Sequence, residues 1–228
     1  MSLLVIVLGP LSEALKRNLE NALTSEFLLT HVSFVDASNR SEWLEWSSDL
    51  ESTQLGVGKG AAGCWLAHRQ AWIEAKDSKY DNVLILEDDA KVTKYGLRHL
   101  SLVVENFKQS NYSILHLGDH ERSIFLTPRL LINSGNLRKI TKHFFERVIF
   151  YPFKPRIARN RFPYSAHAYL LDRSIIPVLI KNAPMFIFPV DVYLNAISQV
   201  PNNRVASVRT PLIVQANNRD SLIDKFGR

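Results

Sequence analysis

Short apolar runs alternate with stretches of helical periodicity along most of the chain. Leu3 to Leu8 are all apolar, which is typical of a buried strand, and Gly9-Pro10 predicts where that strand ends. Ser12 predicts a helix cap, because the apolar positions behind it recur at helical spacing: Leu15, Leu19 and Leu23. His31 to Val35 alternates apolar and polar residues and predicts a second strand. A strand, a helix and a strand in this order open an α/β fold.

The alternation of strands and helices continues after residue 60. The predicted elements are a helix over Gly63–Ala75, a strand over Val83–Leu86, a helix from Leu97 to Phe107, a strand over Ser113–Gly118, a strand preceded by small residues within Phe162–Leu171, a short helix opened by Ser174, a helix with Asp191 near its start, and one last strand between Arg204 and Gln215. Together they predict an α/β protein with a mixed, mainly parallel sheet flanked by helices.

Three adjacent acids, Glu87, Asp88 and Asp89, directly follow the strand over Val83–Leu86. Ligands of open α/β sheets gather outside the carboxyl ends of such strands, and crowded carboxylates need a positive charge nearby. Mg²⁺ and Mn²⁺ prefer carboxylate and phosphate oxygens, so we predict a divalent cation here. If strand geometry continues to Asp89, Glu87 and Asp89 share one face and Asp88 points away. A loop of solvated acids, or a helix start that favours negative charge, is the alternative explanation.

Other candidate residues also lie where predicted elements begin or end. Asp119 and His120 follow the strand over Ser113–Gly118, although Gly-Asp is common turn chemistry as well. Asp191 is a candidate base or acceptor-binding carboxylate, and stabilisation by the helix start explains it equally well. His68 lies in a predicted helix, where a histidine has a structural role more often than a catalytic one.

Composition narrows the class of protein. A chain of 228 residues with 46% hydrophobic residues suits a single domain with an ordinary core. The single cysteine, Cys64, excludes an internal disulfide and fits a reducing compartment. The apolar start is too short for a signal peptide, and no stretch approaches the length of a membrane span. The net charge of +6 favours acidic partners.

Much of the positive charge falls in residues 122–161, where ten Lys and Arg residues face the single acid Glu146 and alternate with aromatic residues. Such a stretch can contact nucleic acid, an anionic membrane surface or an acidic acceptor. An ordinary solvated face with aromatic anchors is the alternative, and no recognised nucleic-acid motif accompanies the stretch. The residues singled out as acceptor or membrane contacts are Arg156, Arg159 and Arg161.

Four segments together resemble glycosyltransferase family 25, the bacterial lipopolysaccharide and procollagen galactosyltransferase family. They are Gly63-Cys64-Trp65-Leu66-Ala67-His68, Leu84-Ile85-Leu86-Glu87-Asp88-Asp89, Ala166-His167-Ala168-Tyr169-Leu170-Leu171 and Pro189-Val190-Asp191. Two features depart from the family pattern. Ala67 stands where the family usually has Ser, and Val7-Leu8-Gly9-Pro10 replaces its usual Ile-Asn-Leu strand end.

The resemblance implies a single GT-A-like (Rossmann-related) domain over residues 1–228, with 122–161 as a basic insertion and 217–228 as a tail. It also implies a UDP-hexose donor and Mn²⁺ or Mg²⁺ as the cofactor. On this interpretation Asp89 ligates the metal. Glu87 is a metal ligand, or it reaches the ribose or a metal-bound water. Asp88 supports these residues without contacting the metal itself. The remaining donor-side residues are Gly63, His68 and Tyr169.

For the reaction, the resemblance implies transfer of galactose with inversion to a glycan or lipid-linked oligosaccharide of lipopolysaccharide, lipooligosaccharide or capsule. Asp191 is the first candidate for the base and Asp119 the second. The expected location is the cytoplasm, at the inner face of the membrane, with no nucleic-acid partner. A metal-dependent nucleotidyltransferase and a basic nucleic-acid-binding module are the competing hypotheses.

Overall fold

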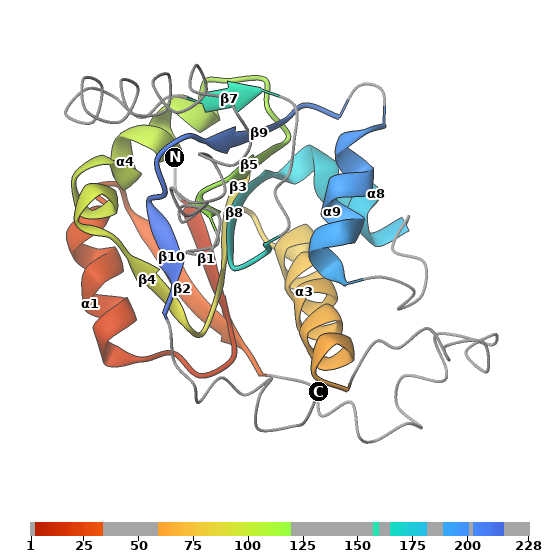
Figure 1. The fold of residues 1–228 in the computed structure, drawn as a ribbon, viewed down its shortest axis with the longest axis horizontal. Coiled ribbons are helices and arrows are strands. Elements are labelled where there is room, and N and C mark those ends of the chain that lie inside the picture. The colour runs from red at the N-terminus through yellow and green to blue at the C-terminus, as the bar shows by residue number, and fades with distance from the viewer. Residues whose placement is uncertain are drawn as a thin grey trace, which may run out of the picture.

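A computed structural model of the protein describes residues 3–33, 59–119, 157–159, 165–181, 189–200 and 203–216. For residues 59–62, 119 and 157–159 it describes the backbone alone. A seven-stranded sheet separates two groups of helices, and a three-stranded sheet lies beside it (Figure 1).

The large sheet is mixed, with most of its strands in one direction. Its strands are, in spatial order, β2 (Phe27–Val32), β1 (Leu3–Leu8), β3 (Asn82–Glu87), β8 (Ala168–Asp172), β5 (Ile114–His116), β9 (Val205–Val208) and β7 (Ile157–Arg159). β8 and β7 run antiparallel to their neighbours, and the other strands share one direction. This confirms the predicted α/β class and the mainly parallel sheet flanked by helices.

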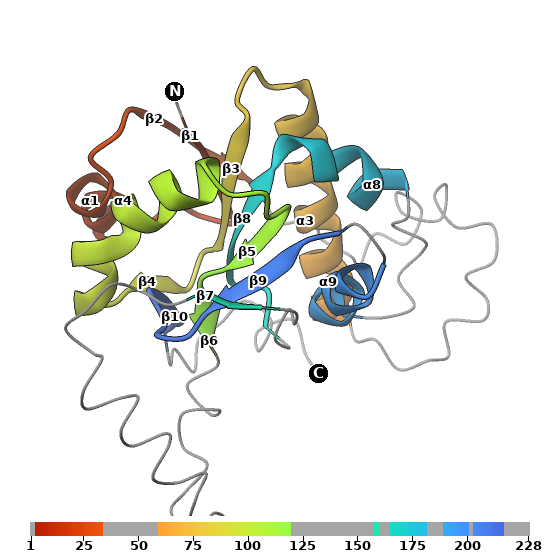
Figure 2. The same ribbon diagram turned by 90° about the horizontal axis from the view of Figure 1, so that it is seen from above.

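Helices cover both faces of this sheet. On one face lie α3 (Lys59–Asp77), α8 (Ile176–Lys181) and α9 (Val190–Ser198), and on the other lie α1 (Glu13–Ala22) and α4 (Lys94–Lys108) (Figure 2). Strand side chains alternate between the faces. Val83 and Ile85 therefore pack with the α3 group, while Leu84 and Leu86 pack with α1 and α4. A strand covered on both sides must be apolar throughout, which explains the continuous runs in the sequence.

The small sheet lies at the edge where β3 ends. It consists of β4 (Ala90–Val92), β10 (Ile213–Gln215) and β6 (Gly118–Asp119), with β10 in the middle. Gly118 is required here because a Cβ atom would lie 2.1 Å from the His167 Nε2 and 2.9 Å from the carbonyl oxygen of Ile213. The close approach joins the small sheet to the start of β8.

Several predicted boundaries are confirmed. Leu3–Leu8 is a strand, and it is followed directly by Gly9, which has a φ of 98°. The Ser12 hydroxyl caps α1 by accepting a hydrogen bond from the Leu15 amide at 3.1 Å. The predicted helices over Gly63–Ala75 and Leu97–Phe107 lie within α3 and α4.

Other boundaries were wrong. The second strand begins at Phe27 and not at His31, because its pairing with β1 extends back to Leu3. Arg204–Gln215 contains two strands that belong to different sheets, and not one strand. Asp172, and not Ser174, caps the short helical segment, because its carboxylate accepts the amide of Ser174 at 2.9 Å.

The strand geometry predicted to continue through the acids also fails. β3 ends at Glu87, and Asp88 and Asp89 form a turn that leads into β4. Strand alternation therefore says nothing about Asp88 and Asp89, and the turn determines where they lie.

Some predictions fall outside the described residues. Those are most of the basic stretch 122–161, with Arg156, Arg161 and His120, and the tail 217–228. Of Arg159 only the backbone, in β7, is described. Among the helices of the described part, none combines the length and apolarity that crossing a bilayer requires.

Candidate active site at the edge of the sheet

Glu87 is the last residue of β3 and lies at the edge of the large sheet. It stands opposite Leu8 of β1, and its amide donates to the carbonyl oxygen of His167, just before β8, at 2.9 Å. Its side chain follows Val83 and Ile85 onto the α3 face, as strand alternation requires. The side chain is 13% exposed, so the carboxylate sits near the surface but mostly out of water.

Two side chains of α3 meet this carboxylate. The His68 Nε2 lies 3.5 Å from the Glu87 Oε1, and the Cys64 Sγ lies 3.7 Å from the same oxygen. Cys64 and His68 are four residues apart, which places them on one face of the helix. Burial acts to raise the pKa of Glu87, but His68, His167 and Cys64 outweigh it and hold the pKa below its ordinary value. Glu87 is therefore ionised at neutral pH.

A buried chain of hydrogen bonds holds the histidine ring. The His68 Nδ1 lies 2.7 Å from the Tyr169 hydroxyl, which also accepts the indole N–H of Trp72 at 3.1 Å. The rings of His68 and Tyr169 stack with centroids 5.6 Å apart. All three side chains are inaccessible to solvent. Together they fix the orientation of His68 and aim its Nε2 at Glu87.

Asp89 is held by the end of β10. Its Oδ2 accepts the side-chain amide of Gln215 at 2.8 Å, and its carbonyl oxygen accepts the Ala216 amide at 2.8 Å. Its Oδ1 is buried and has no hydrogen-bond partner among the described residues. Burial and the charge of Glu87 raise the pKa of Asp89 to about 7, although the Gln215 hydrogen bond acts in the opposite direction.

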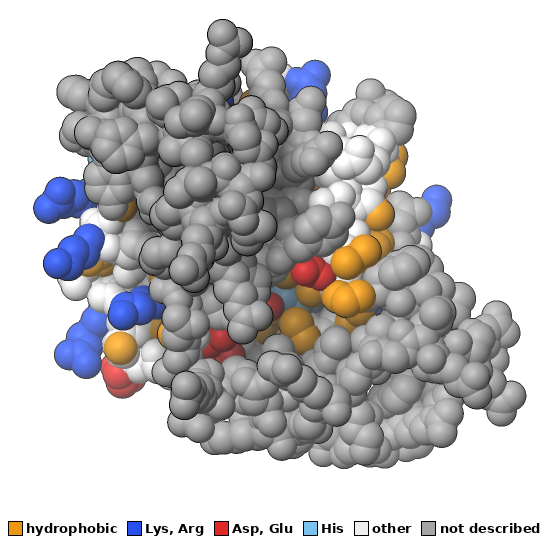
Figure 3. Space-filling model, in the orientation of Figure 1, with side chains coloured by type: hydrophobic (Ala, Val, Ile, Leu, Met, Phe, Trp, Pro, Cys, Tyr) orange, Lys and Arg blue, Asp and Glu red, His pale blue; other side chains and the backbone are white. Residues whose placement is uncertain are grey.

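Asp88 and Asp191 complete an acidic cluster with Glu87 and Asp89. Burial, followed by the charge of Glu87, raises the pKa of Asp88. Burial also raises the pKa of Asp191, with a smaller contribution from Glu87, so these carboxylates are close enough to interact. Figure 3 shows red acidic side chains near the centre of one face, with pale-blue histidine surface between them.

Asp191 stands in the first turn of α9, as predicted. Its Oδ1 accepts the Val192 amide at 2.8 Å, so stabilisation by the helix start is part of its role. α9 packs against α3 through Tyr193, whose ring centroid lies 5.1 Å from that of Trp65. This packing brings Asp191 to the α3 face, where Glu87 also lies.

The other predicted site residues have less direct relations to the cluster. Gly63 is buried on α3 next to Cys64. Tyr169 is fully buried and reaches Glu87 only through His68. Asp119 lies in β6 opposite Val214 of β10, on the far side of β10 from β4, and its side chain is outside the described part of the chain.

Sequence reasoning missed Gln215, which no motif marks. It also gave no role to Cys64, although the spacing of Cys64 from His68 was a usable signal.

Two buried histidines near the strand ends were also given no role. His167 bonds the Ser165 hydroxyl through its Nδ1, and its Nε2 lies 3.3 Å from the carbonyl oxygen of Ile213. Burial, and then His167, lower the pKa of His116 to about 3, so His116 is uncharged and structural at neutral pH.

Carboxylate oxygens are the donors that Mg²⁺ and Mn²⁺ prefer. Among the described residues, no three of the four carboxylates of the acidic cluster bring ligand atoms within 4.8 Å of one another, so a cation here would complete its shell with other oxygens. The buried, unpaired Oδ1 of Asp89 is the specific sign, because an orphaned carboxylate oxygen is costly unless a ligand satisfies it.

The fold and site thus define an α/β protein with a carboxylate cluster where a central strand ends. Residues 16–194 match the model of glycosyltransferase family 25, described as LPS (lipopolysaccharide) biosynthesis protein. The match covers most of the chain, so the chain belongs to this family and is a glycosyltransferase of lipopolysaccharide biosynthesis. An enzyme of this class uses a nucleotide-sugar donor and a glycan acceptor.

One similar solved structure is described as "Crystal Structure of a Mycobacterial Protein". It is 15% identical with a TM-score of 0.37, over 98% of this chain and 70% of that chain. No curated protein sequence matches the chain.

Replacing Asp89 by Asn should stabilise the protein in a pH-dependent way. Between pH about 4, near the ordinary pKa of Asp, and pH 7, the folded chain keeps a proton on Asp89 that the unfolded chain has lost. The contribution of Asp89 to stability therefore falls as pH rises through this window, whereas Asn does not titrate. We expect the variant to unfold at least about 2 °C higher than wild type at pH 8, with the difference shrinking towards pH 4.

The measurement is thermal unfolding followed by circular dichroism from pH 4 to 8, in the presence of a chelator. Asp81→Asn, at an exposed position before β3, is the control for removing one carboxylate outside the site. A pH-independent difference for Asp89→Asn would show that Asp89 is not crowded in the folded state.

Proposed function

We propose that the chain is a metal-dependent galactosyltransferase with a single GT-A-like domain. It moves galactose from a UDP-hexose donor, with inversion, to a glycan or lipid-linked oligosaccharide acceptor of lipopolysaccharide, lipooligosaccharide or capsule. Family membership supports sugar transfer over the nucleotidyltransferase and nucleic-acid-binding hypotheses. The observation that carries the metal dependence is the unpaired, buried Oδ1 of Asp89 within a cluster of carboxylates.

We assign the metal to Asp89 and Glu87. When bound, Mn²⁺ or Mg²⁺ supplies positive charge against the diphosphate leaving group. Gln215 occupies the Oδ2 of Asp89, so Oδ1 is the oxygen left to act as a ligand. Gln215 thereby turns the carboxylate of Asp89 in the way that outer partners orient metal ligands.

The donor side of the site consists of Asp88, Gly63, His68 and Tyr169. Asp88 lies in the same turn as Asp89 and supports it without contacting the metal itself. Tyr169 is fully buried, so it acts by holding His68, and His68 in turn fixes the carboxylate of Glu87. Gly63 starts the segment of α3 that carries Cys64 and His68.

For the chemical step we assign Asp191 as the base. Its Oδ1 accepts the Val192 amide, so Oδ2 is the oxygen that takes the proton of the acceptor hydroxyl. The acceptor oxygen bonds to the anomeric carbon as the bond from that carbon to the diphosphate oxygen breaks on the opposite face. A raised pKa suits Asp191 to accept a proton. Asp119 is the second candidate.

We place the enzyme in the cytoplasm, at the inner face of the membrane. The net charge of +6 and the basic stretch 122–161 support attraction to anionic lipid or to an acidic acceptor. Arg156, Arg159 and Arg161 are the assigned contacts.

Removing the metal ligand or its support should weaken metal binding before any donor is present. We expect Asp89→Asn to raise the Mn²⁺ dissociation constant by more than about 100-fold, and Gln215→Leu by about 10–100-fold, the usual effect of an outer partner. Electron paramagnetic resonance of free Mn²⁺ measures both, and nucleotide-sugar turnover should fall in parallel. Asp81→Asn is the control. Unchanged Mn²⁺ affinity in Asp89→Asn would remove the metal site.

Replacing Asp191 by Asn should separate catalysis from binding. We expect the transfer rate to fall by about 10²–10⁴-fold, the contribution typical of a general base, with Mn²⁺ and donor affinities unchanged within about twofold. Single-turnover transfer and calorimetric donor binding measure the two quantities. Equal losses in both would assign Asp191 to donor binding. A loss in Asp119→Asn alone would move the base to Asp119.

Neutralising Arg156, Arg159 and Arg161 to Gln should weaken binding to anionic vesicles. Each basic side chain near such a surface contributes about 1 kcal/mol, so the triple variant should bind about 100-fold more weakly. Sedimentation with vesicles of phosphatidylglycerol and phosphatidylcholine measures this. The matched control replaces three exposed lysines of the α3 and α8 side, Lys76, Lys79 and Lys181. Equal losses in both variants would mean that the effect follows net charge and not this stretch.

A further inference from the structure

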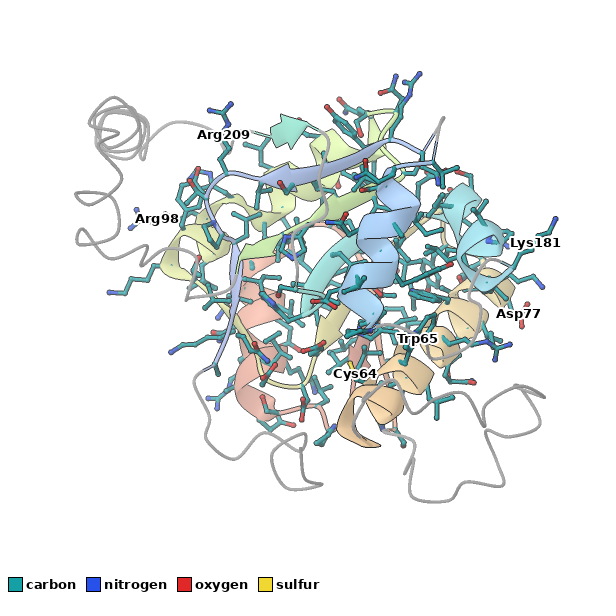
Figure 4. The ribbon with its side chains drawn as sticks, turned by 45° about the vertical axis from the view of Figure 1, so that its right-hand side comes forward. Cys64, Trp65, Asp77, Arg98, Lys181 and Arg209 are labelled. Atoms are coloured by element: carbon teal, nitrogen blue, oxygen red, sulfur yellow. The ribbon has the colours of Figure 1, made fainter. Side chains whose placement is uncertain are left out.

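A second set of ligating atoms lies on the α3 side of Glu87. One ligand atom from each of Cys64, His68 and Glu87 lies within 4.8 Å of the other two. Cys64 is on the first part of α3, beside the strands of the large sheet (Figure 4). The proposed transferase chemistry uses carboxylate oxygens and gives the thiol no role. We propose that these three atoms form a separate site for a borderline-soft divalent cation, with Zn²⁺ as the best match.

The two distances that meet at the Glu87 Oε1 match a tetrahedral zinc site. With Zn–S about 2.3 Å and Zn–N or Zn–O about 2.0–2.2 Å, neighbouring ligand atoms of a tetrahedron lie about 3.3–3.7 Å apart. The Nε2 to Oε1 distance is 3.5 Å and the Sγ to Oε1 distance is 3.7 Å. The first is too long for a good N–H···O hydrogen bond, whose usual length is about 2.9 Å. The Sγ and the Nε2 thus each stand at the distance from Oε1 that a shared ion would set.

The His68 ring is also held in an orientation that suits metal binding. Its Nε2 is buried and makes no hydrogen bond within the described part of the chain, where it faces the Glu87 carboxylate at ion-pair distance. Its Nδ1 is held by the Tyr169 hydroxyl, which Trp72 fixes in turn. Metal-binding histidines are usually oriented in this way through the second ring nitrogen. The Nε2 of His68 is therefore the ring nitrogen available to a metal, and it lies on the side of Glu87 and Cys64.

The charges balance when the ion binds. Burial, and then Glu87, raise the pKa of the Cys64 thiol, so the sulfur carries a proton before the ion arrives. Binding breaks the S–H bond, forms a metal–sulfur bond and releases one proton to water. A thiolate, a carboxylate and a neutral imidazole then hold a doubly charged cation, and the mostly buried site is neutral overall. Three protein ligands leave one position open, as in catalytic zinc sites.

The two cation sites share Glu87, which has a functional consequence that rests on the proposed function. A Zn²⁺ bound to the Oε1 ties the carboxylate to α3 and withdraws it from the Mn²⁺ ligated by Asp89. Zn²⁺ should therefore inhibit the Mn²⁺-dependent transferase, and the loss of Cys64 should relieve that inhibition.

The test uses the full chain, freed of metal and titrated with Co²⁺ as a coloured substitute for Zn²⁺. Because Cys64 is the single cysteine, an absorption band from sulfur-to-cobalt charge transfer reports on it alone. We expect such a band to saturate at one ion per chain. It should vanish in Cys64→Ser, and the Zn²⁺ dissociation constant should rise there by more than about 100-fold, beyond the effect of losing an outer partner.

Asp89→Asn distinguishes this proposal from the proposed function. That variant should lose Mn²⁺ binding and keep the charge-transfer band, whereas Cys64→Ser should keep Mn²⁺ binding. A second measurement needs no variant: X-ray absorption of the Zn²⁺-loaded wild type should show one sulfur at about 2.3 Å with nitrogen and oxygen at about 2.0–2.2 Å. Binding of Co²⁺ without the sulfur band, or a Zn²⁺ shell without sulfur, would overturn the proposal.

Discussion

The structure depends on keeping an ionised carboxylate, that of Glu87, mostly out of water at the end of a central strand. Burial alone would raise the pKa of Glu87 and favour its protonation. The His68 Nε2 at 3.5 Å, with smaller contributions from His167 and Cys64, outweighs burial, and the Tyr169 hydroxyl holds the histidine in place at 2.7 Å. Because Trp72 anchors Tyr169 within the core, the packing of α3 on the sheet determines the position of the carboxylate.

The rest of the site follows from how the two sheets meet. Glu87 is the last residue of β3 and faces α3, while the turn after it sends the chain into β4 and the small sheet. β10 pairs with β4 so that Gln215 stands opposite Ala90 and reaches the Asp89 carboxylate. Each carboxylate is therefore held by a different layer, and the two can be adjusted separately by substitutions in α3 or in β10.

The sequence was sufficient for features that arise from local chemistry. The runs Leu3–Leu8 and Val83–Leu86 had to be buried strands, and Ser12 had the side chain and spacing of a cap. The division of Arg204–Gln215 between two sheets was not predictable, because it depends on pairing with β5 and β4, which are distant in sequence. For the same reason no local signal marked Gln215. The Cys64–His68 spacing was visible, but its meaning required knowing that Glu87 faces that side of α3.

If both proposed cation sites exist, Glu87 is the residue that they share. On the side of Asp89 and Asp88, a cation would meet carboxylate oxygens, which suit ions that keep water and phosphate ligands. On the side of α3, the cation would meet sulfur and imidazole, which suit softer ions. The two cations would compete for the Glu87 carboxylate, so the orientation of this carboxylate couples the two sites. A buried residue such as Tyr169, which contacts neither cation, would then shift that competition by moving His68.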